Sequence, residues 1–369
     1  MERETIEPLV LYGCAISYFT GKLEHYFRIK GIPYRLQPMT ETHRKRVGEG
    51  TGSTQMPAVQ LADGRWMSDS TPIIQWFEEQ YPETPVIPHD PLQRFFSLLL
   101  EDYADEWLWR PAMHYRWHYR EGAMWAGTHL AEEVLPETRA PAFLKRWRLI
   151  RRQRDGYTVG DGITPSQVPG VEAIYLRTLA QLQAVLSERP FLLGERPSLA
   201  DIGFMGPFFR HFGLDPVPAE ILRQQAPAVW EWLARSWNTR LQDSDGGLLE
   251  GVPPDWGPLL DEIGDHYLPY LCANLEAIVA GKQRFDADIG GVGYRGARSS
   301  KYRVWVLKRL RQHFDELTGE ARETAQALLE RHRCWEPLWR HPELPISDEF
   351  CARLPFHADA KMIDVYEGE

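Results

Sequence analysis

The stretch TQMPAVQLADGRWMSDSTPIIQWFEEQY, residues 54–81, decides the fold of this chain. Pro57 stands directly before an alternating apolar run, and proline is tolerated at the first residue of a strand because no ladder N–H is needed there. An Asp-Gly turn then leads into a second short strand at residues 65–67. Hydroxyl and carboxylate side chains at residues 68–71 stand just ahead of an apolar-periodic segment that has a proline in its first turn. The stretch is therefore expected to form a β-hairpin followed by a helix.

The start of that helix offers a place for a zwitterionic ligand. A helix N-terminus presents free backbone N–H groups and the positive end of the helix dipole, which suit a small carboxylate. Asp69 stands beside this N-terminus and can hold a cation. Together these groups suit the head of an amino acid, although a plain capped helix after a hairpin explains the same residues.

The residues before this stretch predict a strand, a helix and a second strand. Residues 8–13 (PLVLYG) suit a short buried strand, and apolar residues recur at helical spacing from about Tyr18 to Lys30. Residues 34–36 follow as a second strand. The resulting order, β-α-β and then β-β-α, is that of a thioredoxin-like domain.

This order resembles the glutathione-binding half of the thioredoxin-like domain in glutathione transferases. The segment LYGCAISYFTGKLEHYFRIKGIPY, residues 11–34, is also similar to the first strand–helix unit of that family, including Lys22 and the closing G-I-P-Y. The two units stand in the correct order and spacing, so the chain is identified as a member of this family over residues 8–245.

The resemblance implies a glutathione-binding set. In the family the proline at the position of Pro57 is cis, and the backbone of the preceding residue, here Met56, pairs with the cysteinyl unit of glutathione. The acid–serine pair, here Asp69 and Ser70, holds the γ-glutamyl end. Gln55 belongs to the same expected set, although the family often has a basic residue at that position.

The residue that meets the glutathione sulfur is expected at the start of the first helix. In the family an activating hydroxyl or thiol lies five residues after the aromatic residue of the strand, and counting from Tyr12 gives Ser17. A hydroxyl that donates a hydrogen bond to a thiolate lowers the pKa of the thiol; a plain N-cap is the alternative role of Ser17. Cys14 forms a C-x-x-S pattern with Ser17 and suggests a redox centre, but it lies three residues upstream, so Ser17 is the expected catalytic residue.

Composition restricts the class of protein further. The chain has 369 residues, 43% of them hydrophobic, which predicts two globular domains and an appendage. No apolar run is long enough to span a bilayer, and the start MERETIEPLV lacks the features of a signal peptide, so a cytoplasmic location without membrane contact is expected. The net charge of −10 argues against nucleic acid as the main partner. Four widely spaced cysteines favour reduced thiols, and no metal site is expected.

A proline-rich connector at residues 82–90 separates this domain from a segment with helical periodicity throughout. Residues 98–120 predict one long aromatic helix bent near Pro111. In the family the corresponding helix faces glutathione across the cleft, so four residues of this segment are candidates for an apolar co-substrate wall, although core packing explains most of them equally well. These candidates are Trp107, Trp109, Tyr115 and Trp117.

The second domain also carries a structural signature at residues 190–201, PFLLGERPSLAD. Ser198 is expected to cap a buried helix there, with Asp201 closing a reciprocal capping box. His114 and His118 stand four residues apart, but without the internal glutamate of H-E-x-x-H they are a weak indication of metal binding.

About a third of the chain remains after residue 245. It predicts helices at residues 260–279, 302–317 and 320–332, and a short strand near residues 285–289. An apolar stripe in the first of these helices, made of Leu268, Leu271, Leu275 and Ile278, is expected to dock on the helical domain.

The extension also contains a G-x-G-x-x-G pattern at residues 291–296. A dinucleotide site needs a second strand that ends at an acidic residue, whereas the matching Asp315 lies inside a helical pattern. A glycine turn is therefore the expected structure.

The sequence thus predicts a thioredoxin-like α/β domain at residues 1–84, an all-α domain at residues 91–245 and a mostly helical extension at residues 246–369. The resemblance implies an enzyme that activates the glutathione thiolate for attack on a small electrophile, with glutathione as co-substrate, and assembly as a homodimer. Two alternatives stay open: a glutathione-dependent thiol–disulfide reductase that uses Cys14, and a non-catalytic binding or assembly protein on the same scaffold.

Overall fold

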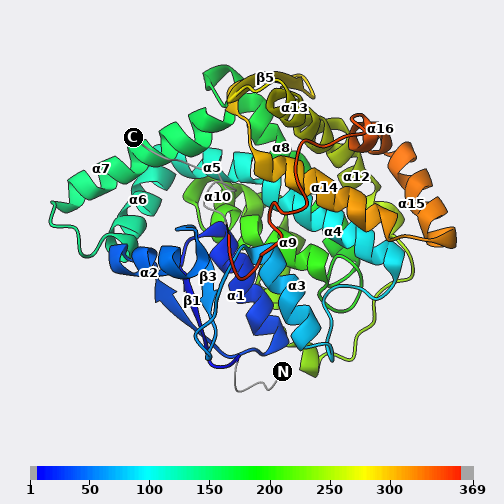
Figure 1. Ribbon diagram of the computed structural model, residues 1–369, viewed down its shortest axis with the longest axis horizontal. Helices are drawn as coiled ribbons and strands as arrows, with labels where there is room; N and C mark the ends of the chain where they lie inside the picture. Colours follow the sequence, from blue (N-terminus) through cyan, green and yellow to red (C-terminus); the bar gives the residue numbers. More distant parts are fainter. Residues whose placement is uncertain (1–5, 359–369) are drawn as a thin grey trace.

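A four-stranded mixed sheet with the strand order β2-β1-β3-β4 organises the N-terminal part of the computed structural model, which describes residues 6–358 (Figure 1). Strands β1 and β2 are parallel, and the pairs β1–β3 and β3–β4 are antiparallel. The elements of this part are β1 (Leu9–Gly13), α1 (Tyr18–Lys30), β2 (Tyr34–Pro38), α2 (Glu41–Thr51), β3 (Ala58–Gln60), β4 (Trp66–Ser68) and α3 (Ser70–Gln80). This is the predicted β-α-β, β-β-α order, with an additional helix α2 between the two units.

The two faces of the sheet follow from strand alternation. Leu9 and Leu11 of β1 point to a core shared with α1 and α3, whereas Tyr12 points to a second core with Val47 of α2. The hairpin register places Val59 opposite Met67, so both residues lie in the first core. Alternation therefore fixes which side of the sheet each helix covers.

The helical domain begins at α4, and the predicted long helix is in fact two helices. The helix is interrupted at residues 107–108, between α4 and α5, and not at Pro111. Pro111 lies in the first turn of α5, where its missing N–H is not needed, so it starts a helix instead of bending one. The helices are α4 (Pro91–Glu106), α5 (Trp109–His118), α6 (Arg120–Val134), α7 (Ala142–Gln153), α8 (Val168–Glu188), α9 (Leu199–Pro207), α10 (Pro216–Gln225) and α11 (Pro227–Asn238).

The predicted capping box is present at the start of α9. The Ser198 N–H donates to the Asp201 carboxylate at 2.9 Å, and the Ser198 side chain meets the backbone N–H of Asp201 in return. The second carboxylate oxygen of Asp201 accepts from the Trp232 indole at 3.0 Å, which ties α11 to this corner.

The extension contains five α-helices and a β-hairpin within residues 246–358. They are α12 (Gly257–Glu262), α13 (Leu268–Val279), β5 (Arg284–Ile289), β6 (Val292–Arg298), α14 (Lys301–Asp315), α15 (Gly319–Arg331) and α16 (Trp335–Trp339). Residues 290–291, both glycines with positive φ, turn β5 into β6, so the G-x-G-x-x-G pattern belongs to a hairpin as expected. The predicted helix 260–279 is interrupted by a π-helical turn at Ile263–Tyr267.

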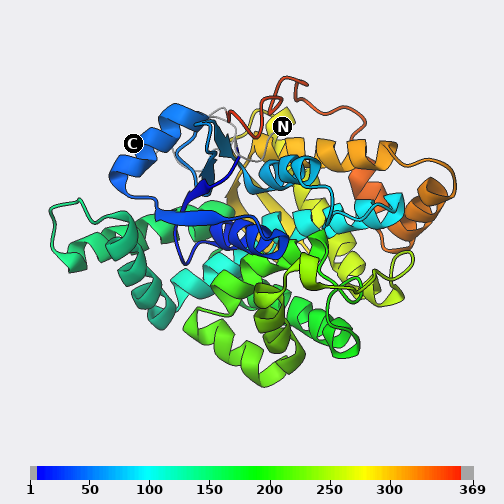
Figure 2. The same ribbon diagram turned by 90° about the horizontal axis from the view of Figure 1, so that it is seen from below.

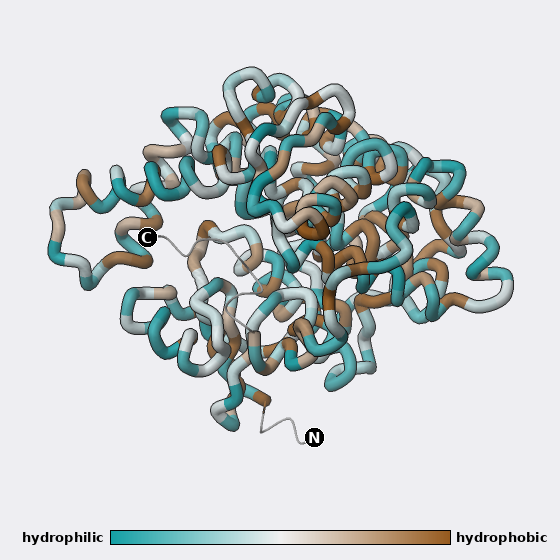
Figure 3. Tube along the Cα trace, turned by 45° about the horizontal axis from the view of Figure 1, so that its top comes forward, coloured by the Kyte–Doolittle hydropathy of each residue, from teal (hydrophilic) through white to brown (hydrophobic). Residues whose placement is uncertain are grey.

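The extension shares one hydrophobic core with the helical domain. Helix α14 lies along α4, where the rings of Phe314 and Phe95 are 5.8 Å apart, and the two parts are seen side by side in Figures 1 and 2. Three residues of the predicted apolar stripe, Leu268, Leu271 and Leu275, are at most 1% exposed, and the fourth, Ile278, is partly buried against the same core. Figure 3 shows the hydrophobic positions concentrated in the interior where these helices meet. The extension is therefore part of the folded body.

The end of the described chain covers the open edge of the sheet. The Ser68 N–H of edge strand β4 donates to the Pro355 carbonyl at 2.8 Å, and the Phe356 ring meets Trp76 of α3 edge-on at 5.6 Å. Further on, the Ala358 N–H donates to the Thr51 carbonyl at the end of α2. An uncovered edge strand is a site of unwanted pairing, and this segment occupies it. None of the helices described between residues 6 and 358 has both the length and the apolarity of a bilayer-spanning helix.

We expect Leu307→Ala in α14 to lower the free energy of unfolding of the whole helical body by about 2–5 kcal/mol, because Leu307 is fully buried in the shared core. Val279→Ala is the matched control, since Val279 is 66% exposed and its truncation should change stability by less than about 0.5 kcal/mol. Urea denaturation followed by tryptophan fluorescence and by circular dichroism measures both. A separate early transition for α14, with the remainder unfolding as in the wild type, would show that the extension is an independent unit.

Candidate functional site

Ser17 is the N-cap of α1 and faces the cleft between the N-terminal sheet and the helical domain. Its Oγ accepts a long hydrogen bond from the Thr20 N–H at 3.4 Å. The loop before it is held from the helical domain: Glu133 of α6 accepts from the Ala15 N–H at 2.8 Å, and Arg116 of α5 donates to the Ile16 carbonyl at 2.7 Å. The position of Ser17 is therefore fixed by contacts across the domain boundary.

Cys14, the alternative nucleophile, is fully buried and does not line the cleft. Its thiol donates to Glu133 at 3.2 Å, and burial together with this carboxylate raises the pKa of the thiol to about 12. A thiol in this state stays protonated at neutral pH and is a poor nucleophile.

The hairpin brings the other predicted residues to the same place. The Met56–Pro57 peptide bond is cis, as the family resemblance implies. Ser70 is the first residue of α3, and Asp69 before it has a φ of 73°. Positive φ is uncommon for a residue with a side chain, and here it turns the end of β4 directly into the helix.

Asp69 meets the extension. Its side chain does not cap α3; instead its Oδ2 accepts a hydrogen bond from the Tyr302 hydroxyl of α14 at 2.8 Å. Burial raises the pKa of Asp69 to about 6, although the Tyr302 hydrogen bond and the Lys22 charge both act in the opposite direction. The carboxylate that the sequence assigns to ligand binding is thus already held by a residue from the other end of the chain.

A buried ion cluster lies behind this carboxylate. The ammonium of Lys22 in α1 lies 2.5 Å from Glu101 Oε1, contacts Asp105 Oδ2, and lies 3.0 Å from the Thr71 hydroxyl of α3. Burial alone would lower the pKa of Lys22, but the two carboxylates outweigh it and raise the pKa above its ordinary value. Burial raises the pKa of Asp105 against the opposing charge of Lys22, and its Oδ1 has no partner among the described residues.

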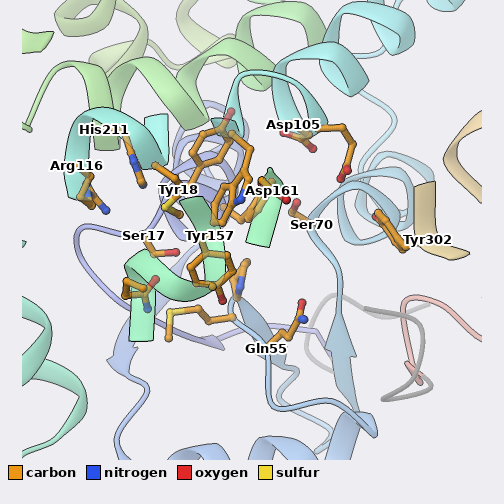
Figure 4. A pocket seen from close by; sticks show the side chains of 18 of the residues that line it. Ser17, Tyr18, Gln55, Ser70, Asp105, Arg116, Tyr157, Asp161, His211 and Tyr302 are labelled. Atoms are coloured by element: carbon orange, nitrogen blue, oxygen red, sulfur yellow. The ribbon is translucent and has the colours of Figure 1, made fainter. Parts of the chain in front are cut away.

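One cavity of about 340 Å³, a size typical of small-ligand sites, is lined by residues from all three parts of the chain. The N-terminal domain contributes Ser17, Gln55, Met56, Pro57, Asp69 and Ser70; the helical domain contributes Asp105, Glu106, Trp109, Met113, Arg116, Trp117, Tyr157, Asp161 and His211; and the extension contributes Arg298, Ser299, Ser300, Tyr302 and Arg303. Figure 4 shows Ser17, Arg116 and His211 on one side of the cavity and Ser70, Asp105 and Tyr302 on the other.

The cavity wall carries charges of both signs. Arg303 of the extension reaches Asp161 at 3.3 Å and lies 3.8 Å from Glu106, so it neutralises two acids of the helical domain. Arg44 of α2 and Arg152 of α7 also line the cavity, and burial together with the nearby Arg152 charge lowers the pKa of Arg44. Acids and guanidiniums within one cavity suit a ligand that carries both an ammonium and carboxylates.

Two of the four residues predicted for the apolar wall lie in the cavity, and two do not. Trp109 and Trp117 line it because, with Met113, they follow one face of α5 at i, i+4 and i+8. The prediction is wrong for Trp107 and Tyr115, which do not line the cavity. Trp107 precedes α5 and packs against Tyr270 of the extension at 5.5 Å, and Tyr115 points to another face, toward Tyr175 at 5.2 Å.

Several residues of the cavity had no signal in the sequence. The contribution of Tyr302 and Arg303 depends on how a distant helix docks, and the contribution of His211 depends on a π-helical turn at Phe208–Phe212. The His114–His118 pair is a stacked ring pair, with His114 bonded to Glu172 at 2.9 Å. Within residues 6–358 no group of histidine, cysteine and acidic side chains is arranged to hold a metal ion.

Comparisons with known proteins agree with this arrangement. The model of the glutathione S-transferase N-terminal domain matches residues 11–85, and that of the C-terminal domain matches residues 165–235. These two segments carry the two domains of the glutathione S-transferase family, which confirms the predicted family and fold class.

Relatives with curated descriptions are distant. Glutathione S-transferase U7 of Arabidopsis thaliana is 25% identical over 113 residues, which are 30% of this chain and 50% of that protein. Glutathione S-transferase U4 of the same plant is 25% identical over 105 residues, 28% of this chain and 46% of that protein. The chain spans about half the length of the curated relatives it matches.

Solved structures with similar folds include the beta-etherase LigF of Sphingobium sp. strain SYK-6, with 20% identity and a TM-score of 0.43 over 62% of this chain and 93% of that one. A rice glutathione S-transferase in complex with glutathione has 19% identity and a TM-score of 0.38 over 68% of this chain and 94% of that one.

Because the pKa of Asp69 is raised, the stability of the ligand-free protein is expected to depend on pH. Because the folded state holds the Asp69 proton more tightly than the unfolded state does, ionisation of this carboxylate destabilises the fold above about pH 6 and has no such effect below about pH 4. Asp69→Asn removes the ionisation and keeps an acceptor for Tyr302. We expect this variant to melt at a higher temperature than the wild type at about pH 8, with a smaller difference at about pH 5.

Thermal melts of the ligand-free proteins at both pH values give the comparison, with the exposed Asp63→Asn of the same hairpin as control. A lower melting temperature for Asp69→Asn at the higher pH would contradict the assigned environment of Asp69.

Proposed function

We propose that this protein is a glutathione transferase that ionises the thiol of bound glutathione and directs the thiolate at a small electrophile. The thiol proton leaves to solvent, the sulfur forms a bond to the electrophilic carbon, and the leaving group departs with its electron pair. Glutathione is the co-substrate, and no metal takes part in the proposal.

One observation carries the proposal: Ser17, the Met56–Pro57 segment and the Asp69–Ser70 pair line the same cavity. A ligand that spans them meets a hydroxyl at a helix N-terminus, a backbone strand edge and an acid beside a second helix N-terminus. The two helix termini favour negative charge, which suits the thiolate at Ser17 and the α-carboxylate at Ser70.

Ser17 is the proposed activating residue. Its oxygen accepts only the 3.4 Å bond from Thr20 among the described contacts, so its O–H can be donated to the glutathione sulfur. Donation to the charged form stabilises the thiolate over the thiol and lowers the pKa of the bound thiol.

Asp69, with Tyr302 bonded to one of its oxygens, is the proposed acceptor for the γ-glutamyl ammonium. An ammonium that approaches the other oxygen favours the ionised carboxylate and offsets the effect of burial. Met56 and Gln55 are proposed to hold the cysteinyl and glycyl parts, and Trp109 and Trp117 form the apolar wall for the electrophile.

The buried, protonated state of Cys14 makes the reductase alternative less favoured. A non-catalytic binding or assembly protein would have the same cavity and would differ from a transferase only in showing no turnover. The proposal also includes a homodimer and a cytoplasmic location. The edge of β4 is already paired with Pro355 of the same chain, so a dimer would use another surface.

Ser17→Ala is expected to raise the pKa of the bound thiol by about 1–2 units, because a hydrogen bond to a charged group is worth about 1.5–3 kcal/mol. Turnover with a chloronitrobenzene should then fall near neutral pH and recover in part as the pH rises. Ser17→Thr, which keeps a hydroxyl and an N-cap, is the rescue control, and Cys14→Ser should change little. Loss of activity in Cys14→Ser with an unaffected Ser17→Ala would favour the reductase mechanism.

The γ-glutamyl assignment is tested by binding alone. Asp69→Asn and Ser70→Ala should each weaken glutathione binding about tenfold or more, since each removes a charge-assisted contact worth about 1.5–3 kcal/mol. Tyr302→Phe should weaken it less, because only the orientation of Asp69 is lost. Titration calorimetry on the folded variants measures this, with Asp63→Asn as the matched control. Wild-type affinity in both Asp69→Asn and Ser70→Ala would remove the site assignment.

A further inference from the structure

His211 stands out among the residues of the cavity that the proposed function does not use. It lies in the π-helical turn Phe208–Phe212 between α9 and α10, is 1% exposed, and lines the cavity. Single π-helical turns inside helices are frequent at functional sites. The imidazole packs edge-on against the Tyr18 ring at 5.3 Å and lies 6.4 Å from the Trp109 ring.

The hydrogen bonds of His211 define its tautomer. Nδ1 lies 3.3 Å from the Ala112 carbonyl oxygen, and 3.8 Å from Oδ2 of the Asp215 carboxylate. Both partners can only accept, so Nδ1 carries the proton and donates it. Asp215 is itself held by Arg116 at 2.9 Å, so the group behind the ring is rigid.

The other ring nitrogen is therefore a bare acceptor. Among the described residues Nε2 has no hydrogen-bond partner, although it is buried. Burial, with the nearby Arg116 charge, lowers the pKa of His211 well below its ordinary value, so the ring stays neutral and Nε2 keeps its lone pair. A buried acceptor without a partner is costly, and a ligand that supplies a donor removes this cost.

The surroundings of His211 define the kind of ligand. The Trp109 ring stacks on Phe19 at 5.5 Å and meets Tyr157 edge-on at 5.3 Å, so flat aromatic faces border the imidazole. The Asp215 carboxylate lies at Nδ1, where Arg116 pairs with it, and Nε2 has no hydrogen-bond partner among the described residues. The neighbourhood thus suits a neutral aromatic group that carries one hydrogen-bond donor.

We propose that His211 Nε2 is an acceptor subsite for a hydroxyl or N–H group on the electrophile, and that the cavity selects aromatic electrophiles which carry such a donor. The proposal rests on the proposed function, because it names the class of the second substrate at the same site. His211 takes no proton in the reaction; it positions the electrophile. A site that hydrogen-bonds a substrate hydroxyl rejects the analogue that lacks it, because the acceptor is then left unpaired.

The test compares two electrophiles that differ in the donor: a chloronitrobenzyl alcohol and its methyl ether. In both, the glutathione sulfur displaces chloride from the ring. The wild type should prefer the alcohol in kcat/KM by about tenfold or more, the value expected for one satisfied buried acceptor. A wild-type ratio near one overturns the proposal, and this measurement needs no variant.

Two substitutions distinguish the contribution of Nδ1 from that of Nε2. His211→Asn keeps a donor near the Nδ1 position and loses the acceptor, so the preference for the alcohol should fall to near one. His211→Gln keeps an acceptor near the Nε2 position and should retain most of the preference. Glutathione affinity by calorimetry, without electrophile, should stay at the wild-type value in both.

Two outcomes contradict the proposal even if the wild type prefers the alcohol. An equal loss for both electrophiles in His211→Asn would indicate a purely structural residue. A loss of glutathione affinity in His211→Asn would show that Nε2 accepts its hydrogen bond from glutathione and not from the electrophile. If glutathione affinity is normal but neither electrophile is turned over by any form, including the wild type, the proposed transferase activity fails, and the failure is distinguishable from that of the subsite.

Discussion

The structure depends on one buried cation, the Lys22 ammonium, which is held between Glu101 and Asp105 and bonded to Thr71. These residues come from α1, α4 and α3, so a single charge fixes how the N-terminal sheet docks on the helical domain. Tyr18, one turn earlier on α1, donates to the Ala104 carbonyl and fixes the same junction. Removing one partner of such a cluster leaves an uncompensated buried charge and is strongly destabilising. Ser17 and the start of α3 are therefore held at a set position across the cleft.

The extension completes the site that this junction creates. Tyr302 bonds the carboxylate of Asp69, and Arg303 neutralises Asp161 and Glu106, so α14 forms a wall of the cavity beside the start of α3. The hairpin β5–β6 and α13 bring α14 there through the core shared with α4 and α5. The last third of the chain thus forms part of the cavity wall as well as part of the shared hydrophobic core, although the two matched family domains end at residue 235.

Local signals explain what the sequence could predict. The proline before β3, the Asp-Gly turn and the polar residues before α3 act within a few residues, so the β-β-α unit and the place of Asp69 and Ser70 follow from the sequence itself. The helix boundaries in the aromatic segment at residues 98–120 were harder to predict, because amino-acid composition does not show where a helix starts. With α5 beginning at Trp109, Trp117 faces the cavity and Tyr115 does not. Tyr302 and His211 depend on long-range docking and on a π-helical turn, and neither has a local pattern.

The most direct test of the account is the ultraviolet difference spectrum on adding glutathione to the protein near neutral pH, with S-methylglutathione as the reference ligand. Both ligands are expected to bind in the cavity, and a thiolate absorbance band is expected with glutathione alone, because Ser17 and the start of α1 are proposed to stabilise the ionised sulfur. Binding of glutathione without that band would show a cavity that holds the tripeptide and does not activate it, and would contradict the central claim.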